Sequence, residues 1–154
     1  MTGGTALAAS AAAVRALQAA LRAEHAAVYG YGVVGAHLTG AALAAATSDW
    51  IAHQVARDSL EAMLRAAGRQ PAAAAVAYRL PHPVHNPAEA MSLAGILENR
   101  VTTAYLGLVA LPGSRFREPG ARAVSAAAIR AAFWRGKTVA FPGFPAGALS
   151  PAKL

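Results

Sequence analysis

Glu24 stands inside an apolar helical pattern, where a charged side chain needs an explanation. Apolar or small residues repeat around it in steps of three and four, at Val14, Leu17, Leu21, Val28, Tyr31, Gly35 and Leu38. A second stripe holds His53 and Arg57 together with Trp50, and Glu98 borders a third. A carboxylate enclosed by helices costs several kcal/mol, roughly, unless it is protonated, ion-paired or bound to a metal. The spacing therefore predicts a buried polar site.

Two kinds of chemistry fit these residues. Glu24, His53 and Glu98, with His25 adjacent, could form a mononuclear centre for a divalent metal such as iron, manganese or zinc. The protein would then be a metal-binding protein or an oxidase. Alternatively Arg57, one turn from His53, neutralises Glu24, because a guanidinium holds one or two carboxylates well. A cation already present disfavours a second one. We therefore favour a buried network without a metal, a cofactor or a catalytic residue, made of Glu24, His25, Tyr31, His53, Arg57 and Glu98.

Four helices are expected to position this site in an all-α fold. Cap residues and apolar periodicity place them at about residues 10–45, 48–67, 87–111 and 118–136. Three prolines between the second and third helices, and a fourth at the start of the third, predict a long extended crossover. After residue 136 the proline-rich and glycine-rich tail, 137–154, is irregular, and its Phe141 and Phe144 are too apolar to leave in water. The tail is expected to pack across its own helices or against a partner.

Composition limits the remaining possibilities. The length of 154 residues fits one domain, 1–154, and the absence of cysteine excludes disulfides and thiolate metal sites. The start of the chain lacks the pattern of a secretory signal, so a cytoplasmic location is the default. Residues 26–48 carry no Asp, Glu, Lys or Arg, but His37 and four glycines in this run argue against a membrane span.

The net charge of +7 is concentrated near the end of the chain. At helical spacing, a basic stripe forms on the outer side of the fourth predicted helix, from Arg115, Arg122, Arg130 and Lys137. This stripe is compatible with weak, salt-sensitive nucleic-acid binding, but no recognition motif or set of interleaved aromatic residues accompanies it. Nucleic-acid binding is therefore the less favoured alternative, and no small-molecule ligand is indicated.

Four segments of the chain resemble a bacterial family of ferritin-like proteins, domain of unknown function 4439. They are AEHAAVYGYGVVGAHL at 23–38, HQVARD at 53–58, LPHPV at 80–84 and AFPG at 140–143. The resemblance covers nearly the whole chain and implies a ferritin-like four-helix bundle with its long crossover. It brings no established activity.

The ligand set that the ferritin-like resemblance implies is incomplete. Metal-binding members place a Glu on each of two helices and a Glu-x-x-His on each of the other two. Glu24 and Glu98 could match the first pair, but Trp50 stands three residues before His53, and Pro119 to Leu154 contains no Asp, Glu or His. We therefore expect a degenerate metal site in a structural or binding module, rather than an enzyme.

A homodimer is expected from two apolar features. The charge-free run 26–48 contains more glycines than one close helix contact requires, and the tail adds two phenylalanines. A symmetric dimer is the commonest way for a soluble protein to bury such surface.

Overall fold

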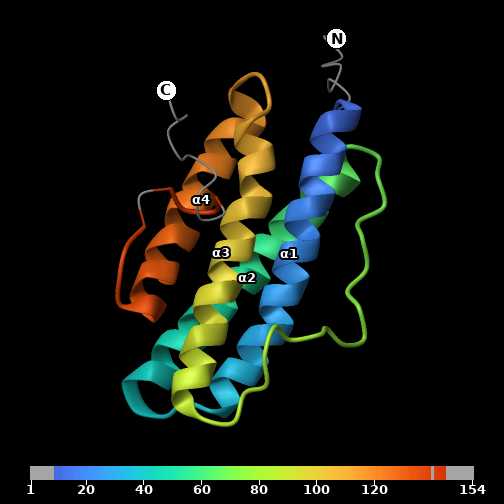
Figure 1. Ribbon diagram of the computed structural model, residues 1–154. Helices are drawn as coiled ribbons and strands as arrows, with labels where there is room; N and C mark the ends of the chain where they lie inside the picture. Colours follow the sequence, from blue (N-terminus) through green and yellow to red (C-terminus); the bar gives the residue numbers. More distant parts are fainter. Residues whose placement is uncertain (1–8, 140, 145–154) are drawn as a thin grey trace, which may run out of the picture.

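The computed structural model describes residues 9–139 and 141–144, which contain four helices and no strand. The helices are α1 (Ala11–Ala36), α2 (Gly40–Ala66), α3 (Pro87–Val109) and α4 (Ser114–Arg135). The prediction of an all-α chain with four helices is confirmed (Figure 1). Within the described residues, no helix has a stretch long and apolar enough to cross a membrane.

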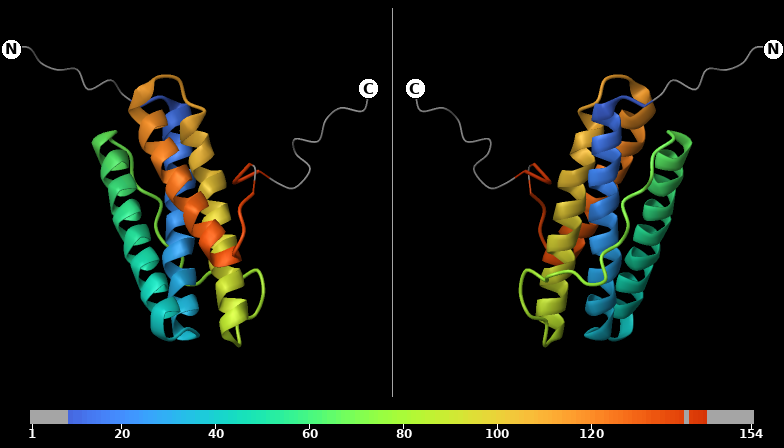
Figure 2. Two further views of the ribbon diagram at one scale, coloured as in Figure 1. Left: turned by 90° about the vertical axis from the view of Figure 1, so that its left-hand side faces the viewer. Right: turned by 90° about the vertical axis from the view of Figure 1, so that its right-hand side faces the viewer.

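The helices α1 and α3 form the centre of the fold. The helix α1 packs extensively against α2 and α3, and α4 packs against α3. The helices α2 and α3 run in the same direction, opposite to α1 and α4 (Figure 1). This order requires residues 67–86 to return along the length of the molecule, and they pass beside α1 on the way (Figure 2).

Polar contacts attach this returning segment to α1. The side chain of Gln18 donates to the carbonyl oxygen of Gln70 at 2.7 Å and accepts from the amide of Ala72 at 2.8 Å. His25 Nε2 lies 2.9 Å from the carbonyl oxygen of Ala72. His25 therefore satisfies an extended backbone segment, which has no helical or sheet partner of its own.

The turn between the first two helices lies earlier than the sequence predicted. The first helix was expected to continue to about residue 45, but α1 ends at Ala36 and α2 begins at Gly40. His37 closes α1, with Nδ1 at 2.9 Å from the carbonyl oxygen of Val33. Gly40 has φ +55°, a conformation that favours glycine, so the chain reverses there.

The polar run at residues 47–49 resembles a helix cap but lies inside α2. Thr47 Oγ1 donates back to the carbonyl oxygen of Leu43 at 2.8 Å, one turn earlier in the same helix. Asp49 accepts a hydrogen bond from Trp134 of α4. The same residue types can thus cap a helix or bond elsewhere: here Thr47 bonds within α2 and Asp49 bonds to α4.

The fourth helix begins four residues before its predicted start at 118. Pro119 lies inside α4, where its missing amide removes one backbone hydrogen bond. The preceding turn is retained because Phe116 packs against the apolar core and Arg117 Nε donates to carbonyl oxygens near the end of α3. The ends of α2 and α4 and both ends of α3 lie within two residues of their predicted positions.

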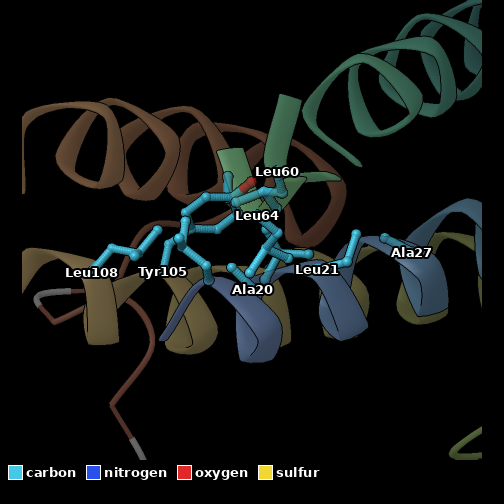
Figure 3. Packing of buried hydrophobic residues seen from close by; sticks show 10 residues of the cluster. Ala20, Leu21, Ala27, Leu60, Leu64, Tyr105 and Leu108 are labelled. Atoms are coloured by element: carbon cyan, nitrogen blue, oxygen red, sulfur yellow. The ribbon is translucent and has the colours of Figure 1, made fainter. Parts of the chain in front are cut away.

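Two apolar clusters form the interior. The first lies toward the start of α1 and the end of α3, where side chains of α1, α2 and α3 meet (Figure 3). Its buried members are Leu17, Ala20, Leu21, Ala27, Leu60, Leu64, Val101, Tyr105, Leu108 and Ala127. The second, at the other end, is made of Tyr31, Val34, Leu38, Ala46, Ala90, Leu93, Ala94, Leu97 and Trp134. The predicted polar residues Glu24, His53 and Glu98 are buried as well.

Gly30 shows that one of the helical glycines serves packing within the chain. A Cβ at this position would lie 2.5 Å from Leu97 Cδ1, so any other residue would force the buried Leu97 side chain of α3 to shift. Gly32, by contrast, has no atom within 4 Å of the position of a Cβ.

The tail prediction is tested only as far as residue 144, because residues 145–154 lie outside the described part of the chain.

Candidate functional site

His53 of α2 lies between two carboxylates in the centre of the protein. Its Nδ1 is 2.7 Å from Glu24 Oε2 of α1, and its Nε2 is 2.9 Å from Glu98 Oε1 of α3. All three side chains are buried, with at most 2% of any residue's surface exposed. One imidazole ring thus joins three helices.

Glu98 collects several donors on one of its two oxygens. Its Oε1 accepts from the hydroxyl of Tyr31 at 2.6 Å and from Arg130 Nε of α4 at 3.0 Å, in addition to His53. Within the described residues, the other oxygen, Oε2, is buried and has no hydrogen-bond partner. Through Arg130 the network reaches the fourth helix.

Two further groups complete the network at its edges. Tyr105 donates to Glu24 Oε1 at 2.8 Å, so both oxygens of Glu24 are occupied. Asp49 Oδ2 accepts from Trp134 Nε1 at 2.8 Å and lies 3.3 Å from the hydroxyl of Tyr31. We call Glu24, Tyr31, Asp49, His53, Glu98, Tyr105, Arg130 and Trp134 the charge network.

The geometry favours an imidazolium ion at His53. A carboxylate oxygen only accepts, so each ring nitrogen that faces one must carry a hydrogen. Burial lowers the pKa of His53, but the hydrogen bonds to Glu24 and Glu98 outweigh it and raise the pKa to about 9. For Glu98, burial acts to raise the pKa, yet the hydrogen bond from His53 and the positive charges of His53 and Arg130 bring it below its ordinary value.

The same balance of burial and charge sets the pKa values of the other titratable groups in the charge network. Burial raises the pKa of Asp49, and the hydrogen bond from Trp134 opposes this only in part. Burial and the neighbouring carboxylates also raise the pKa of Tyr31 and Tyr105, which keeps both phenols protonated as donors. Burial lowers the pKa of Arg130, but the charge of Glu98 more than compensates and the pKa rises.

The donor arrangement differs from that of a metal centre. Metal ligands point their lone pairs at one common position, whereas Glu24 and Glu98 bond to opposite edges of the His53 ring. The imidazole itself therefore fills the space between the carboxylates, and a guanidinium lies on Glu98. No group of three His, Cys, Asp or Glu side chains within the described residues is placed to hold a metal ion.

The structure brings together most of the predicted site residues. Glu24, Tyr31, His53 and Glu98 belong to the charge network, whereas His25 bonds to the segment 67–86 instead.

The expected role of Arg57 does not occur. Its Nε donates to the neighbouring Asp58 at 2.8 Å, on the outside of α2. Arg130, which the sequence placed on an outer basic stripe, is half-buried and supplies the guanidinium that bonds to Glu98. Arg122 of that stripe pairs with Glu118 at 2.7 Å, so the stripe is less basic than expected.

Only weak signals in the sequence pointed to the network residues that were missed. Tyr105 lies seven residues after Glu98, on the same face of α3, and so could have been included. Arg130 lies three residues after the inward-facing Ala127. No signal pointed to Asp49 or Trp134 as polar partners, because their contact joins residues far apart in the chain.

These observations define a class: an all-α, four-helix protein with an ion-paired network between two apolar clusters. The chain belongs to the family described as Domain of unknown function (DUF4439), whose sequence profile matches residues 16–146. This finding agrees with the family resemblance noted in the sequence.

A solved structure supports the same fold. The crystal structure of a conserved hypothetical protein, rv2844, from Mycobacterium tuberculosis is similar, with a TM-score of 0.78 and 32% sequence identity. The similarity covers 83% of this chain and 98% of that one. The comparison with curated proteins finds no match.

Proposed function

We propose that this protein is a ferritin-like bundle whose metal site has been replaced by an ion-paired network. It then acts as a structural or binding module and not as a metal-dependent oxidase. The order of the helices supports the ferritin-like assignment, since a long connection between the second and third helices is typical of that fold. The segment 67–86 provides this connection.

The observation that carries the proposal is the occupation of both His53 nitrogens by carboxylates. A histidine that ligates a metal must offer one nitrogen as a free lone pair, and an imidazolium has none. Arg130 adds a second positive charge on Glu98, from the helix that carries no carboxylate facing the network. Two cations thus balance Glu24 and Glu98 without a metal.

A network in which His53 and Arg130 offset Glu24 and Glu98 suits a scaffold. Buried ion pairs seldom add net stability over apolar packing, but they penalise arrangements in which the partners do not meet. Here Glu24, His53, Glu98 and Arg130 come from four different helices. The network therefore favours one register of the helices, which a binding module requires.

Metal content tests the proposal directly. Protein purified without chelator and dialysed against iron, manganese or zinc should retain well under one equivalent per chain. Glu24→Ala serves as the comparison, because it removes one carboxylate of any centre at this position. Stoichiometric metal in the natural sequence that is lost in Glu24→Ala would contradict the proposal.

A second candidate is a mononuclear metal protein, possible only if His53 loses its proton and turns. The observation in its favour is Glu98 Oε2, a buried carboxylate oxygen without a partner in the described part of the chain. Such oxygens are uncommon in folded proteins. Iron-dependent oxygen consumption by the natural sequence, absent in Glu98→Gln, would support this candidate over the first.

We further propose a cytoplasmic homodimer. Ile51 and Val55 on the outer face of α2 are 52% and 63% exposed, and Gly32 leaves the surface of α1 open. Sedimentation at micromolar concentration should give a dimer mass, and a monomer mass would end this proposal.

A further inference from the structure

The chain after α4 turns back over α3 and α4 and encloses a cavity. Residues 137–139 and 141–143, which we call the strap, run beside these helices (Figures 1 and 2). The cavity has a volume of about 340 Å³. It lies apart from the charge network, since none of the network residues lines it.

Gly143 fixes the strap against α3. Its carbonyl oxygen accepts from Thr103 Oγ1 at 2.6 Å, and its amide lies 3.4 Å from Asn99 Oδ1. Its φ is +83°, and a Cβ would lie 2.9 Å from Thr102 Cγ2, so only glycine fits without a shift. This glycine ends the AFPG segment that helped to identify the family, which gives that segment a structural role.

The interior of the cavity is apolar and its cations lie at one end of the strap. Thr102 and Ala131 are buried, whereas Ile129 and Val139 remain 71% and 44% exposed beside the opening. The other lining residues are Asn99, Ala128, Ala132, Arg135, Lys137, Thr138 and Pro142. Two of these are cationic and none is acidic, so the electrostatic character favours an anion.

Arg135 is held in position at this wall. Its Nη2 donates to the carbonyl oxygen of Gly95 at 3.1 Å, and its Cγ lies where a Cβ on Gly95 would be only 3.0 Å away. Lys137 is exposed at the start of the strap and forms no ion pair with any other described residue. A fixed guanidinium and a free ammonium therefore flank the opening of an apolar cavity.

We propose that this cavity binds a small amphipathic anion, an acyl chain with a terminal carboxylate. The chain would lie against Ala128, Ile129 and Val139, and the carboxylate would meet Lys137 and Arg135. A volume near 340 Å³ is at the lower end for small-molecule sites and holds about ten groups of the size of a water molecule. A chain of about ten carbons matches that size. This inference rests on the binding-module part of the proposed function, but not on the absence of a metal.

Calorimetric titration of the full chain with decanoate, below its micellar concentration, tests the proposal. We expect saturation at one decanoate per chain, and binding roughly tenfold weaker for octanoate, because two buried methylenes are lost. Decanol, which has the same chain without the charge, should bind about threefold to tenfold more weakly than decanoate.

Paired variants separate the cavity from general effects of charge and size. Lys137→Glu should weaken decanoate binding at least about threefold, whereas Arg22→Glu, the same charge change on the exposed face of α1, should not. Ala128→Leu should abolish binding by filling the cavity, and Ala126→Leu, on the exposed face of the same helix, should leave it intact. Circular dichroism confirms that each variant is folded.

Four results would overturn the proposal. They are the absence of saturable binding, equal affinity for decanol and decanoate, equal losses in Lys137→Glu and Arg22→Glu, and binding that appears only when residues 145–154 are deleted. The last result would assign the cavity to the chain's own end. Failure here leaves metal content unchanged, so it is distinguishable from failure of the metal-free proposal.

Discussion

The charge network and the strap cavity handle polar groups in opposite ways. In the network, carboxylates of Glu24 and Glu98 enclose the His53 ring, and Arg130 supplies a further positive charge. At the cavity, apolar walls meet the cations Arg135 and Lys137 without a carboxylate among the lining residues. In the first region His53 and Arg130 offset Glu24 and Glu98 within the chain, whereas the cations of the second have no acidic partner among its described lining residues.

This difference indicates at which of the two regions a ligand would bind with the more favourable free energy. A ligand that enters the network must displace ion pairs that are already desolvated, and breaking one buried pair costs about 3–5 kcal/mol. A ligand in the cavity displaces only water from apolar walls. We therefore expect a ligand to bind less favourably at the buried cluster of His and Glu than in the less polar cavity under the strap.

The largest expected effect is the loss of the network's central carboxylate. Glu98→Ala should lower the free energy of unfolding by about 3–5 kcal/mol, because the buried His53 cation and the half-buried Arg130 would lose this carboxylate partner. Glu118→Ala, which removes an exposed i,i+4 pair with Arg122, should change it by less than about 0.5 kcal/mol. Urea unfolding measures both, and equal effects would erase the contrast between buried and surface charges.

Stability should also depend on pH through His53. Its pKa is about 9 in the folded chain against 6.5 ordinarily, so the folded state binds the proton more tightly. Its contribution is complete below about pH 6.5 and is lost as the pH rises through 9, by up to about 3 kcal/mol. Unfolding at pH 6.5 and 9.5 should show this loss, and His53→Gln should reduce it.

Glu98 has the opposite effect on the pH dependence of stability, because its contribution is lost as the pH falls. Its pKa is lowered in the folded chain, so its contribution is present above the ordinary value of 4.5 and is lost as the pH falls. Stability should therefore be highest between the pH at which Glu98 gains its proton and the pH at which His53 loses its proton. A profile that rises steadily from pH 6.5 to 9.5 would show that His53 is not held as a cation.

A comparison of two arginines tests which cation belongs to the network. Arg130→Ala should destabilise the protein by about 2 kcal/mol, since Glu98 loses a charged hydrogen bond. Arg57→Ala should cost less than about 0.5 kcal/mol, because Arg57 pairs only with exposed Asp58 in this structure. Thermal unfolding of the two variants measures the difference, and the reverse order would restore the role that the sequence assigned to Arg57.

The smallest effect concerns the strap. Gly143 and Gly113 both have positive φ, but only at Gly143 would a Cβ meet neighbouring atoms. Gly143→Ala should therefore cost about 1 kcal/mol more than Gly113→Ala, from crowding against α3. It should also weaken decanoate binding, which Gly113→Ala should leave unchanged. Equal stability losses would mean that the strap does not depend on this contact.

The burial of the polar residues could be predicted from the sequence, because helical spacing indicates which face of a helix is enclosed. Glu24 and His53 lie on apolar stripes, and their burial follows from local periodicity. The choice between Arg57 and Arg130 depends on how α4 approaches α2 and α3, which periodicity within one helix does not contain. The sequence therefore located the site but misassigned its cation.

Helix ends were predicted less well where polar residues had more than one possible partner. Thr47 and Asp49 are residue types that often cap helices, but inside α2 Thr47 bonds to Leu43 of the same helix and Asp49 bonds to Trp134 of α4. The strap shows a similar limit: AFPG was visible as a segment, yet the contact of Gly143 with α3 could be seen only in the folded chain.

The most direct test of the central claim is the protonation state of His53 observed by NMR. In protein labelled with nitrogen-15 on histidine, both ring nitrogens of His53 should carry a proton at pH 7.5 and titrate near pH 9. Adding zinc, manganese or iron should leave these signals unchanged. A neutral His53 ring at pH 7.5, or a signal that shifts at one equivalent of metal and returns with a chelator, would contradict the account.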